Sequence, residues 1–287
     1  MRCPAENRIA DSGVKPVSVH RIDLPGHFNP SIIDWRGRTI LSSRRMKSIY
    51  LTELDERWNP MQTVTLRIVH DKATISAEDA RLYSQDGELC LSFTGVHLKA
   101  GHIQTTVLRA AVDDSLQVVR VWEPQYGRRT WPKEKNWMPF GDDLTVYSVS
   151  PHRVLHGRET LADLHEVPWR PKWSGGLLRG GCPPVRVGDE WWHFFHGVTE
   201  PGSRTADYTL GLYAFSAEAT YTPLRMIPHP ILRDRSTDRP RDENPAVYPC
   251  GAIRRGDVWH ISYGLHNRHA ELATFRHDDL ESALEPV

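Results

Sequence analysis

Two adjacent acidic residues followed closely by an arginine are the most chemically suggestive feature of the sequence. They are Glu78, Asp79 and Arg81, in the run Glu78-Asp-Ala-Arg81. In an extended strand alternate side chains point to one face, so we expect Asp79 and Arg81 to lie side by side. A carboxylic acid so placed can protonate a leaving oxygen, as cleavage of a glycosidic bond requires. The same pattern also fits a structural salt bridge.

Other polar and ionisable side chains stand at the ends of apolar, strand-like segments elsewhere in the chain. They are Asn29, Arg44, Lys135, Asn136, His152, His196, Tyr263, His266 and Asn267. A chemical role for them requires a fold that brings the ends of these segments together.

The chain repeats a simple unit, in which two apolar segments flank a polar turn containing glycine. The turn glycines are Gly37, Gly87, Gly141, Gly188 and Gly256, separated by 50, 54, 47 and 68 residues. Each interval leaves room for about four strands, the content of one propeller blade. We therefore predict an all-β, five-bladed β-propeller. A β-sandwich is the alternative, but repetition at this spacing disfavours it.

The predicted propeller forms a single domain over residues 1–287, with residues 1–26 as an N-terminal extension that closes or flanks it. Only residues 160–164 and 278–284 look helical. The innermost strands of a propeller converge on one axis, so equivalent positions of successive repeats meet in a single pocket. The polar side chains named above occupy such positions.

Composition narrows the set of partners. Thirty-six basic residues balance 36 acidic ones, so no overall charge attracts nucleic acid or an anionic membrane. Residues 1–13 lack the apolar core of a secretory signal, and no stretch approaches the roughly 20 apolar residues that span a bilayer. We expect a soluble, cytoplasmic protein. The four cysteines are scattered, so we expect reduced thiols and no metal site.

Five short motifs resemble those of glycoside hydrolase family 130, in the same order and at similar spacing. They are Phe28-Asn-Pro-Ser31 with Arg44, Glu78-Asp-Ala-Arg81, Lys135-Asn-Trp137, Gly181-Cys-Pro-Pro184 with His196-Gly-Val198, and Tyr248-Pro-Cys-Gly-Ala252 with Tyr263-Gly264. The resemblance covers almost the whole chain from Phe28 onward. Each motif alone is weak, but five in order are specific.

The resemblance implies a carbohydrate-active enzyme that cleaves a β-mannoside by phosphorolysis to mannose 1-phosphate, with Asp79 as the general acid and its proton relayed through a sugar hydroxyl. It implies no cofactor, inorganic phosphate as co-substrate, an oligosaccharide or glycoside as substrate, and a homo-oligomer as one option. Implied phosphate-binding residues are Arg44, Lys135, His152 and His196. Implied sugar-binding residues are Asn29, Glu78, Arg81, Asn136, Tyr263, His266 and Asn267.

Two departures from the family pattern keep other functions open. Ala80 stands where the family has proline, and Asn267 stands where it has aspartate. A hydrolase or mannosyl-transferring relative is one alternative, and hydrolysis requires a second carboxylate, for which Glu123, Asp242 and Glu243 are candidates. A carbohydrate-binding propeller without catalysis is the other, because a fold supplies a pocket and not an activity.

Overall fold

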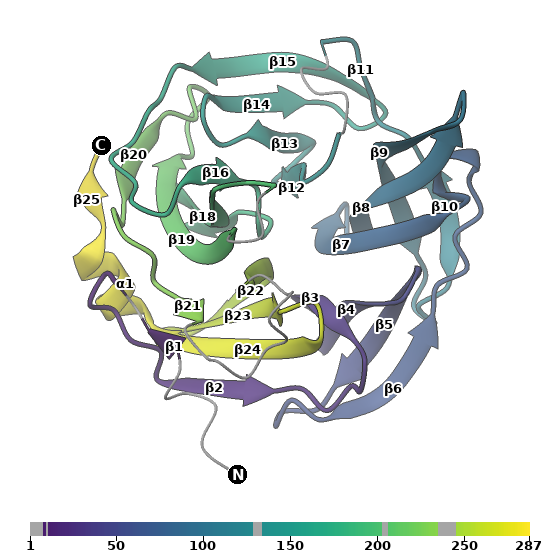
Figure 1. The fold of residues 1–287 in the computed structure, drawn as a ribbon, viewed down its shortest axis with the longest axis horizontal. Coiled ribbons are helices and arrows are strands. Elements are labelled where there is room, and N and C mark those ends of the chain that lie inside the picture. Colours follow the sequence, from purple (N-terminus) through teal and green to yellow (C-terminus); the bar gives the residue numbers. More distant parts are fainter. Residues whose placement is uncertain (1–7, 10, 129–133, 203–205, 235–244) are drawn as a thin grey trace.

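The computed structural model describes residues 8–9, 11–128, 134–202, 206–234 and 245–287, and five of the six β-sheets in these residues surround a central axis (Figure 1). The predicted five-bladed, all-β propeller is confirmed. Each of these five sheets is one blade. Its strands run outward from the axis in an up-and-down order, mostly as antiparallel neighbours.

Blade 1 consists of β3 (Phe28–Trp35), β4 (Arg38–Arg45), β5 (Ser48–Leu54) and β6 (Pro60–Thr65). A short 3₁₀ helix, η2 (Asp71–Ala73), precedes blade 2, which consists of β7 (Ser76–Gln85), β8 (Glu88–Lys99), β9 (His102–Val112) and β10 (Val118–Trp122). Blade 3 consists of β12 (Met138–Phe140), β13 (Leu144–Ser148), β14 (His152–His156) and β15 (Thr160–Val167), with β11 (Gln125–Tyr126) parallel to β15.

In blade 4 the innermost position is shared by β16 (Leu177–Arg179) and β17 (Val185–Val187), followed by β18 (Glu190–Thr199), β19 (Asp207–Ser216), β20 (Pro223–Met226) and β25 (Glu285–Pro286). Blade 5 consists of β22 (Val247–Arg255), β23 (Val258–Leu265), β24 (His269–Arg276) and β2 (Ser18–Arg21). The remaining elements are β1 (Arg8–Ile9), its partner β21 (Arg233–Asp234), and α1 (His277–Ala283).

The two ends of the chain join different blades. Strand β2, from the N-terminal region, is the outermost strand of blade 5, where it pairs with β24. Strand β25, at the other end of the chain, pairs with β20 of blade 4. Blade 5 therefore contains both N-terminal and C-terminal strands, which closes the ring.

The hairpin turns of the innermost strands follow the glycine pattern of the sequence. Arg36-Gly37 has φ angles of 50° and 75°, and Asp86-Gly87 has 50° and 77°. Two left-handed residues in succession make a turn whose twist matches that of the flanking strands. Glycine takes the second position at no steric cost. These turns fix the register of β3 on β4 and of β7 on β8.

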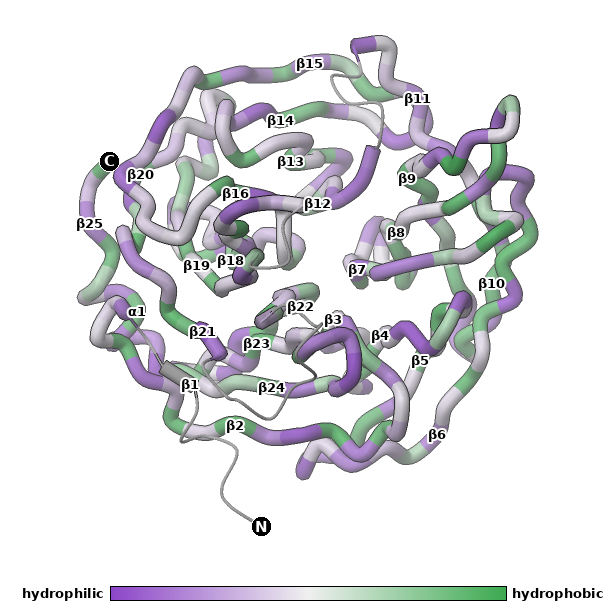
Figure 2. The backbone as a smooth tube through the Cα atoms, viewed as in Figure 1, coloured by the Kyte–Doolittle hydropathy of each residue, from purple (hydrophilic) through white to green (hydrophobic). Residues whose placement is uncertain are grey.

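Apolar side chains fill the spaces between neighbouring blades, and Figure 2 shows hydrophobic residues in all five blades. Between blades 4 and 5 the rings of Trp192 and Trp259 stack in parallel at 5.3 Å between centroids. Between blades 1 and 2, Ile40 packs in one cluster with Leu91. Each blade is thus held by its two neighbours, and the axis stays available for polar residues.

One of the two segments expected to be helical is a strand. Residues 160–164 belong to β15, which pairs with β14 from Val167 to Ala162. Leu161 is buried while Thr160 and Ala162 are exposed, as expected of an outer strand with one covered face. Pairing to the blade overrides local helix propensity here. The second segment does form α1, and none of the described residues belongs to a helix able to cross a membrane.

Candidate functional site

The innermost strands of blades 1 and 2 both bulge at the same place. The pairing of β3 with β4 shifts between Phe28 and Ser31, and that of β7 with β8 shifts between Glu78 and Arg81. Each bulge contains a residue with positive φ, Asn29 at 49° and Asp79 at 52°. A bulge redirects the side chain that it carries. As a result the Asn29 Nδ2 donates to Asp79 Oδ1 at 2.7 Å.

This bulge changes the relation expected between Asp79 and Arg81. Strict alternation predicts that their side chains lie side by side, but the Arg81 guanidinium donates instead to the backbone carbonyl oxygen of Asp79. Arg81 therefore holds the peptide that carries the carboxylate. The expected salt bridge between the two side chains is absent among the described contacts.

Arg44 lies between the two acidic residues. Its Nη2 donates to Glu78 Oε1 at 2.8 Å, and its Nη1 lies 3.6 Å from Asp79 Oδ1. Ser76 Oγ also donates to Glu78 Oε1, at 2.8 Å. The three charged side chains are 19–27% exposed. Arg44 thus fixes both carboxylates while a solvent-facing side remains for a ligand.

A chain of hydrogen bonds beneath Asp79 connects four blades. The Arg81 side chain is buried, and it donates to the Gly181 carbonyl oxygen at 3.2 Å and to Tyr248 Oη at 2.8 Å. Tyr248 Oη donates in turn to Asn136 Oδ1 at 2.9 Å. Burial raises the pKa of Tyr248, so its hydroxyl stays protonated and able to donate. This network ties the Asp79 peptide to the other blades.

Two further cations stand near this network. Lys135 has solvent-exposed surface, but the protein atoms around it desolvate its charged form and so lower its pKa. The charge of Asp79 opposes this shift, and the charges of Arg179 and Arg81 add to it. Arg179 ends β16, where it is the register partner of His196 in β18. Among the described residues, Arg44, Arg81 and Lys135 gather around Glu78 and Asp79. Such a concentration of cations favours an anionic ligand.

His196 is neutral in this position. Burial, followed by the charges of Arg81 and Lys135, holds its pKa well below the usual range. Its ring centroid lies 4.7 Å from that of Tyr248. Near neutral pH the neutral ring of His196 can contact a ligand by hydrogen bonding and not by charge, and its role in binding phosphate stays a prediction.

The structure brings most of the predicted site residues into this cluster. They are Asn29, Arg44, Glu78, Asp79, Arg81, Lys135, Asn136 and His196. They come from the innermost strands and their leading segments in blades 1, 2 and 3, and from β18 in blade 4. The prediction that these residues lie together near the propeller axis is therefore correct. Which ligands they bind stays a prediction.

His152 and Tyr263 do not join the cluster. His152 is fully buried, its Nδ1 lies 3.2 Å from Tyr213 Oη, and burial lowers its pKa to about 3. Tyr263 is fully buried in the core between blades 4 and 5, where its hydroxyl donates to Glu271 Oε2 at 2.7 Å. Neither side chain reaches solvent, so the structure argues against the phosphate and sugar roles expected of them.

His266 and Asn267 occupy the turn between β23 and β24. Both ring nitrogens of His266 are engaged: Nδ1 accepts from the Ala246 N–H at 3.1 Å, and Nε2 lies 2.6 Å from Asp234 Oδ2. This assigns the proton to Nε2. Asn267 is exposed and has a φ of 52°. His266 therefore anchors the neighbouring segments, and its expected role in sugar binding is not supported by its contacts.

Two serines of blade 1 hold the strand on either side of Arg81. Ser42 Oγ donates to the Ala80 carbonyl oxygen at 3.0 Å, and Ser31 Oγ accepts from the Leu82 N–H at 3.0 Å. Both serines are fully buried. They restrain the backbone at the position where the resembled family has proline, so Ala80 does not leave the strand loose.

Sequence reasoning missed three residues that shape the site, namely Tyr248, Arg179 and Ser42. Tyr248 begins the motif Tyr248-Pro-Cys-Gly-Ala252 and is the second residue of β22, as Asn29 is the second residue of β3. A comparison of equivalent positions in the repeats could therefore have found it. Arg179 precedes the Gly181-Cys-Pro-Pro184 motif by two residues. Ser42 lies within an apolar-looking strand, and nothing in the sequence shows that its hydroxyl reaches a neighbouring blade.

One of the three candidates for a second carboxylate, Glu123, lies among the described residues, and it is bound away from Asp79. Lys72 Nζ donates to Glu123 Oε2 at 2.6 Å, which ties Glu123 to blade 2. Asp242 and Glu243 lie outside the described residues. In the described part of the chain, no group of three His, Cys, Asp or Glu side chains is arranged to hold a metal.

No protein-family model matches the chain. In sequence it is 28% identical over 103 residues to the β-1,2-mannobiose phosphorylase of Listeria innocua, a match that spans 35% of this chain and 28% of that enzyme. In structure it resembles the β-1,2-mannobiose phosphorylase of Listeria innocua solved with β-1,2-mannobiose. The TM-score is 0.63 at 15% identity, over 96% of each chain.

A second similar structure represents the GH130 family of mannoside phosphorylases, which contains glycoside hydrolases that target β-1,2 mannosidic linkages in Candida mannan. Its TM-score is 0.66 at 12% identity, over 88% of this chain and 85% of that chain. The chain has the fold of glycoside hydrolase family 130. The resemblance inferred from the five motifs is thereby confirmed at the level of the fold. The cluster around Asp79 lies at or just before the first residues of the innermost strands β3, β7 and β12, which are labelled in Figure 1.

Proposed function

We propose that the protein is a carbohydrate-active enzyme that cleaves a β-mannoside by phosphorolysis, with Asp79 as the general acid. The observation that carries this proposal is a partly exposed carboxylate, fixed by Asn29 and Arg44, with the cations Arg81 and Lys135 close by. A second, weaker support is the similarity to a β-1,2-mannobiose phosphorylase. From that similarity we take β-1,2-mannobiose as the first substrate to test.

In the proposed reaction a phosphate oxygen attacks the anomeric carbon of the mannosyl unit. The bond from that carbon to the bridging oxygen breaks, and the bridging oxygen receives a proton that Asp79 supplies by relay through a sugar hydroxyl. The products are mannose 1-phosphate and the released sugar, and a proton from phosphate restores the acid. Positive charge around the attacking phosphate lowers the cost of bringing it next to a carboxyl group. Arg44 and Lys135 are the proposed source of this charge.

Hydrolysis on the same fold is the second candidate, and the local geometry favours it less. An inverting hydrolase needs a second carboxylate to activate water, separated from the acid by about 6.5–9.5 Å. Glu78 is the carboxylate that shares Arg44 with Asp79, but Arg44 and Ser76 already bind its Oε1. Phosphate needs no such base, so the described part of the cluster fits phosphorolysis better.

The test is to incubate the protein with β-1,2-mannobiose and with β-1,4-mannobiose, each with and without inorganic phosphate. Native protein and Asp79→Asn are compared, with Asp114→Asn, a change at an exposed distant turn, as the matched control. We expect phosphate-dependent formation of mannose 1-phosphate that Asp79→Asn abolishes and Asp114→Asn retains. Release of mannose without phosphate would establish hydrolysis instead, and binding without turnover would establish a non-catalytic propeller.

A further inference from the structure

Gly264 of β23 lies directly against Asn29, where blade 5 meets blade 1. A Cβ atom at position 264 would lie 1.9 Å from Asn29 Oδ1, 2.8 Å from the Asn29 backbone nitrogen and 3.0 Å from the Asn29 Cα. Real Cβ atoms essentially never come within 3.0 Å of another atom. Gly264 is buried, and Asn29 is 3% exposed. The Asn29 side chain therefore occupies the space that any side chain at position 264 would need.

Neighbouring contacts hold β3 at this short distance from blade 5. The buried hydroxyl of Ser262, two residues before Gly264, donates to the Pro30 carbonyl oxygen at 2.7 Å. In β22 a Cβ atom on Gly251 would lie 2.3 Å from the backbone nitrogen of Ile32. The Ser262 hydrogen bond resists separation of the strands. A side chain at position 264 would therefore displace the Asn29 amide before it displaced the backbone.

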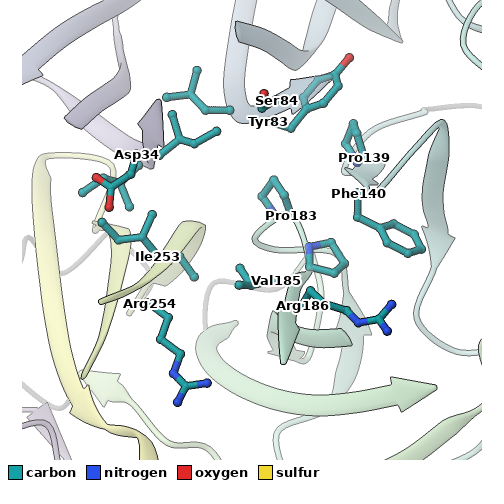
Figure 3. A pocket seen from close by; sticks show the side chains of 16 residues that line it. Asp34, Tyr83, Ser84, Pro139, Phe140, Pro183, Val185, Arg186, Ile253 and Arg254 are labelled. Carbon is teal, nitrogen blue, oxygen red and sulfur yellow. The ribbon is translucent and has the colours of Figure 1, made fainter. Parts of the chain in front are cut away.

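The packing is more open at the other end of the same strands. Asp34 of β3 and Ile253 of β22 line a cavity of about 340 Å³, to which all five blades contribute residues (Figure 3). Added volume can be accommodated there. The tight contact with β3 is thus a feature of the end that carries Asn29, which is the end at which the candidate site lies.

Asn29 connects Gly264 to Asp79. The Asn29 amide is a rigid plane, so its Nδ2, which donates to Asp79 Oδ1 at 2.7 Å, moves whenever its Oδ1 moves. Opening the 1.9 Å contact to 3.0 Å requires a displacement of about 1 Å. That displacement exceeds the range of about 0.5 Å over which N–H···O hydrogen bonds vary in length. A side chain at position 264 would therefore break or distort the hydrogen bond to Asp79.

This hydrogen bond gives the two carboxylate oxygens of Asp79 different roles. Oδ1 accepts from Asn29 and lies 3.6 Å from Arg44 Nη1. An oxygen that accepts from an N–H donor does not at the same time carry a proton directed at that donor. When Asp79 is protonated, the proton is therefore left to Oδ2.

We propose that Gly264 is a positioning residue for the general acid. Because it has no side chain, the Asn29 amide can hold Asp79 Oδ1 in place, and the acidic proton is presented from Oδ2 to the sugar hydroxyl that relays it. This inference rests on the role proposed above for Asp79. It also gives a function to the Tyr263-Gly264 motif, whose tyrosine lies in the core.

The test compares Gly264→Ala with Gly211→Ala as the matched control. Gly211 is also a buried glycine in a strand, β19 of blade 4, and a Cβ atom there would lie 2.3 Å from the Phe195 ring. Both variants should lose stability, but only Gly264→Ala meets Asn29. Asn29→Ala and the double variant Asn29→Ala/Gly264→Ala complete a double-mutant cycle.

The first measurement is phosphorolysis of β-1,2-mannobiose at a temperature where each variant is folded. We expect kcat to fall by about 10- to 100-fold in Gly264→Ala with KM changed by less than about threefold, and kcat to stay within about twofold in Gly211→Ala. In the Asn29→Ala background the glycine substitution should lower kcat by less than about twofold, because no amide remains to be displaced. An equal loss of kcat in both glycine variants, or an undiminished further loss in that background, refutes the proposal.

The second measurement does not depend on turnover. In ¹⁵N NMR spectra the side-chain amide signals of Asn29 are those that Asn29→Ala removes. Burial and the bond to Asp79 should make their hydrogen exchange slow in native protein, and Gly264→Ala should accelerate it at least about tenfold, whereas Gly211→Ala should not. Unchanged exchange in folded Gly264→Ala contradicts the proposal. Accelerated exchange in a protein without phosphorolytic activity would contradict the proposed function and leave the contact between Gly264 and Asn29 established.

If Gly264→Ala does not fold, urea unfolding of the double variant decides. Removal of the Asn29 amide takes away the atom that the new methyl group meets at 1.9 Å, so Asn29→Ala/Gly264→Ala should be more stable than Gly264→Ala alone. A double variant that is no more stable would show that Gly264 does not act through Asn29.

Discussion

Ser42→Ala is the substitution that best separates positioning of Asp79 from general stability. The change removes the hydroxyl that donates to the Ala80 carbonyl oxygen and leaves that buried oxygen without its partner. A buried acceptor left unpaired costs about 1–3 kcal/mol. At roughly 2–4 °C per kcal/mol in a chain of this size, the Tm should fall by about 2–12 °C.

The effect on turnover should be larger than this stability loss implies. Ala80 is the next residue after Asp79, so release of its carbonyl lets the carboxyl group move relative to the leaving oxygen. Displacement of a reacting group by about 1 Å can cost about 100-fold in rate. We therefore expect kcat for phosphorolysis to fall by about 10- to 100-fold at a temperature where the variant is folded, with KM changed much less.

The matched control is Thr52→Val in β5 of the same blade. Thr52 is also fully buried, and its hydroxyl bonds to that of Thr63 at 3.0 Å, away from the axis. Both variants should lose stability, as measured by thermal unfolding, but only Ser42→Ala should lose kcat. If kcat is unchanged in Ser42→Ala, or if Thr52→Val lowers it equally, the serine does not position Asp79 and the reasoning fails.

Three further predictions concern the network and its charges. Tyr248→Phe leaves the Arg81 and Asn136 groups without their bridging hydroxyl and should lower the free energy of unfolding in urea by about 1–3 kcal/mol. The pKa of Lys135 is lowered, so phosphate affinity measured by calorimetry should fall as the pH rises through that lowered pKa. Lys135→Met should weaken phosphate binding about tenfold at neutral pH and remove this pH dependence. Because burial keeps His196 neutral, His196→Gln should leave the shape of the pH profile of phosphate affinity unchanged from about pH 5 to 8, whereas an extra pH dependence in the native protein would show that His196 is charged.

The fold could be predicted from the sequence because each blade begins with the same local signal. A glycine turn such as Asp86-Gly87 between two apolar segments needs no tertiary information, and five copies at a regular spacing leave few architectures. Residues 160–164 show where this reasoning stops. Their local preference is helical, and only the hydrogen bonds offered by β14 make them a strand.

The sequence predicts which residues lie near the site, but not where their side chains point or which of them are charged. Convergence on the axis correctly gathered Asn29, Asp79 and Asn136. The bulge at Asp79 turns its side chain toward Asn29, and Arg81 binds its carbonyl oxygen instead of its carboxylate. A bulge inserts an extra residue into the strand, so the simple alternation of side chains fails at this point. The neutral state of His196 depends on burial beside three cations, which come from separate blades.

The same contacts weigh on whether this propeller is an enzyme or only a binding protein. Alanine in place of proline at position 80 argued for lost catalysis, because it frees the backbone that aims Asp79. Ser42 and Ser31 restrain that backbone from the neighbouring blade, and Arg81 holds the Asp79 carbonyl. A protein that only binds sugar gains nothing from fixing one carboxylate so closely beneath a cationic cluster. The restraint is useful when a proton must be delivered to one oxygen, which is why phosphorolysis is the activity to test first.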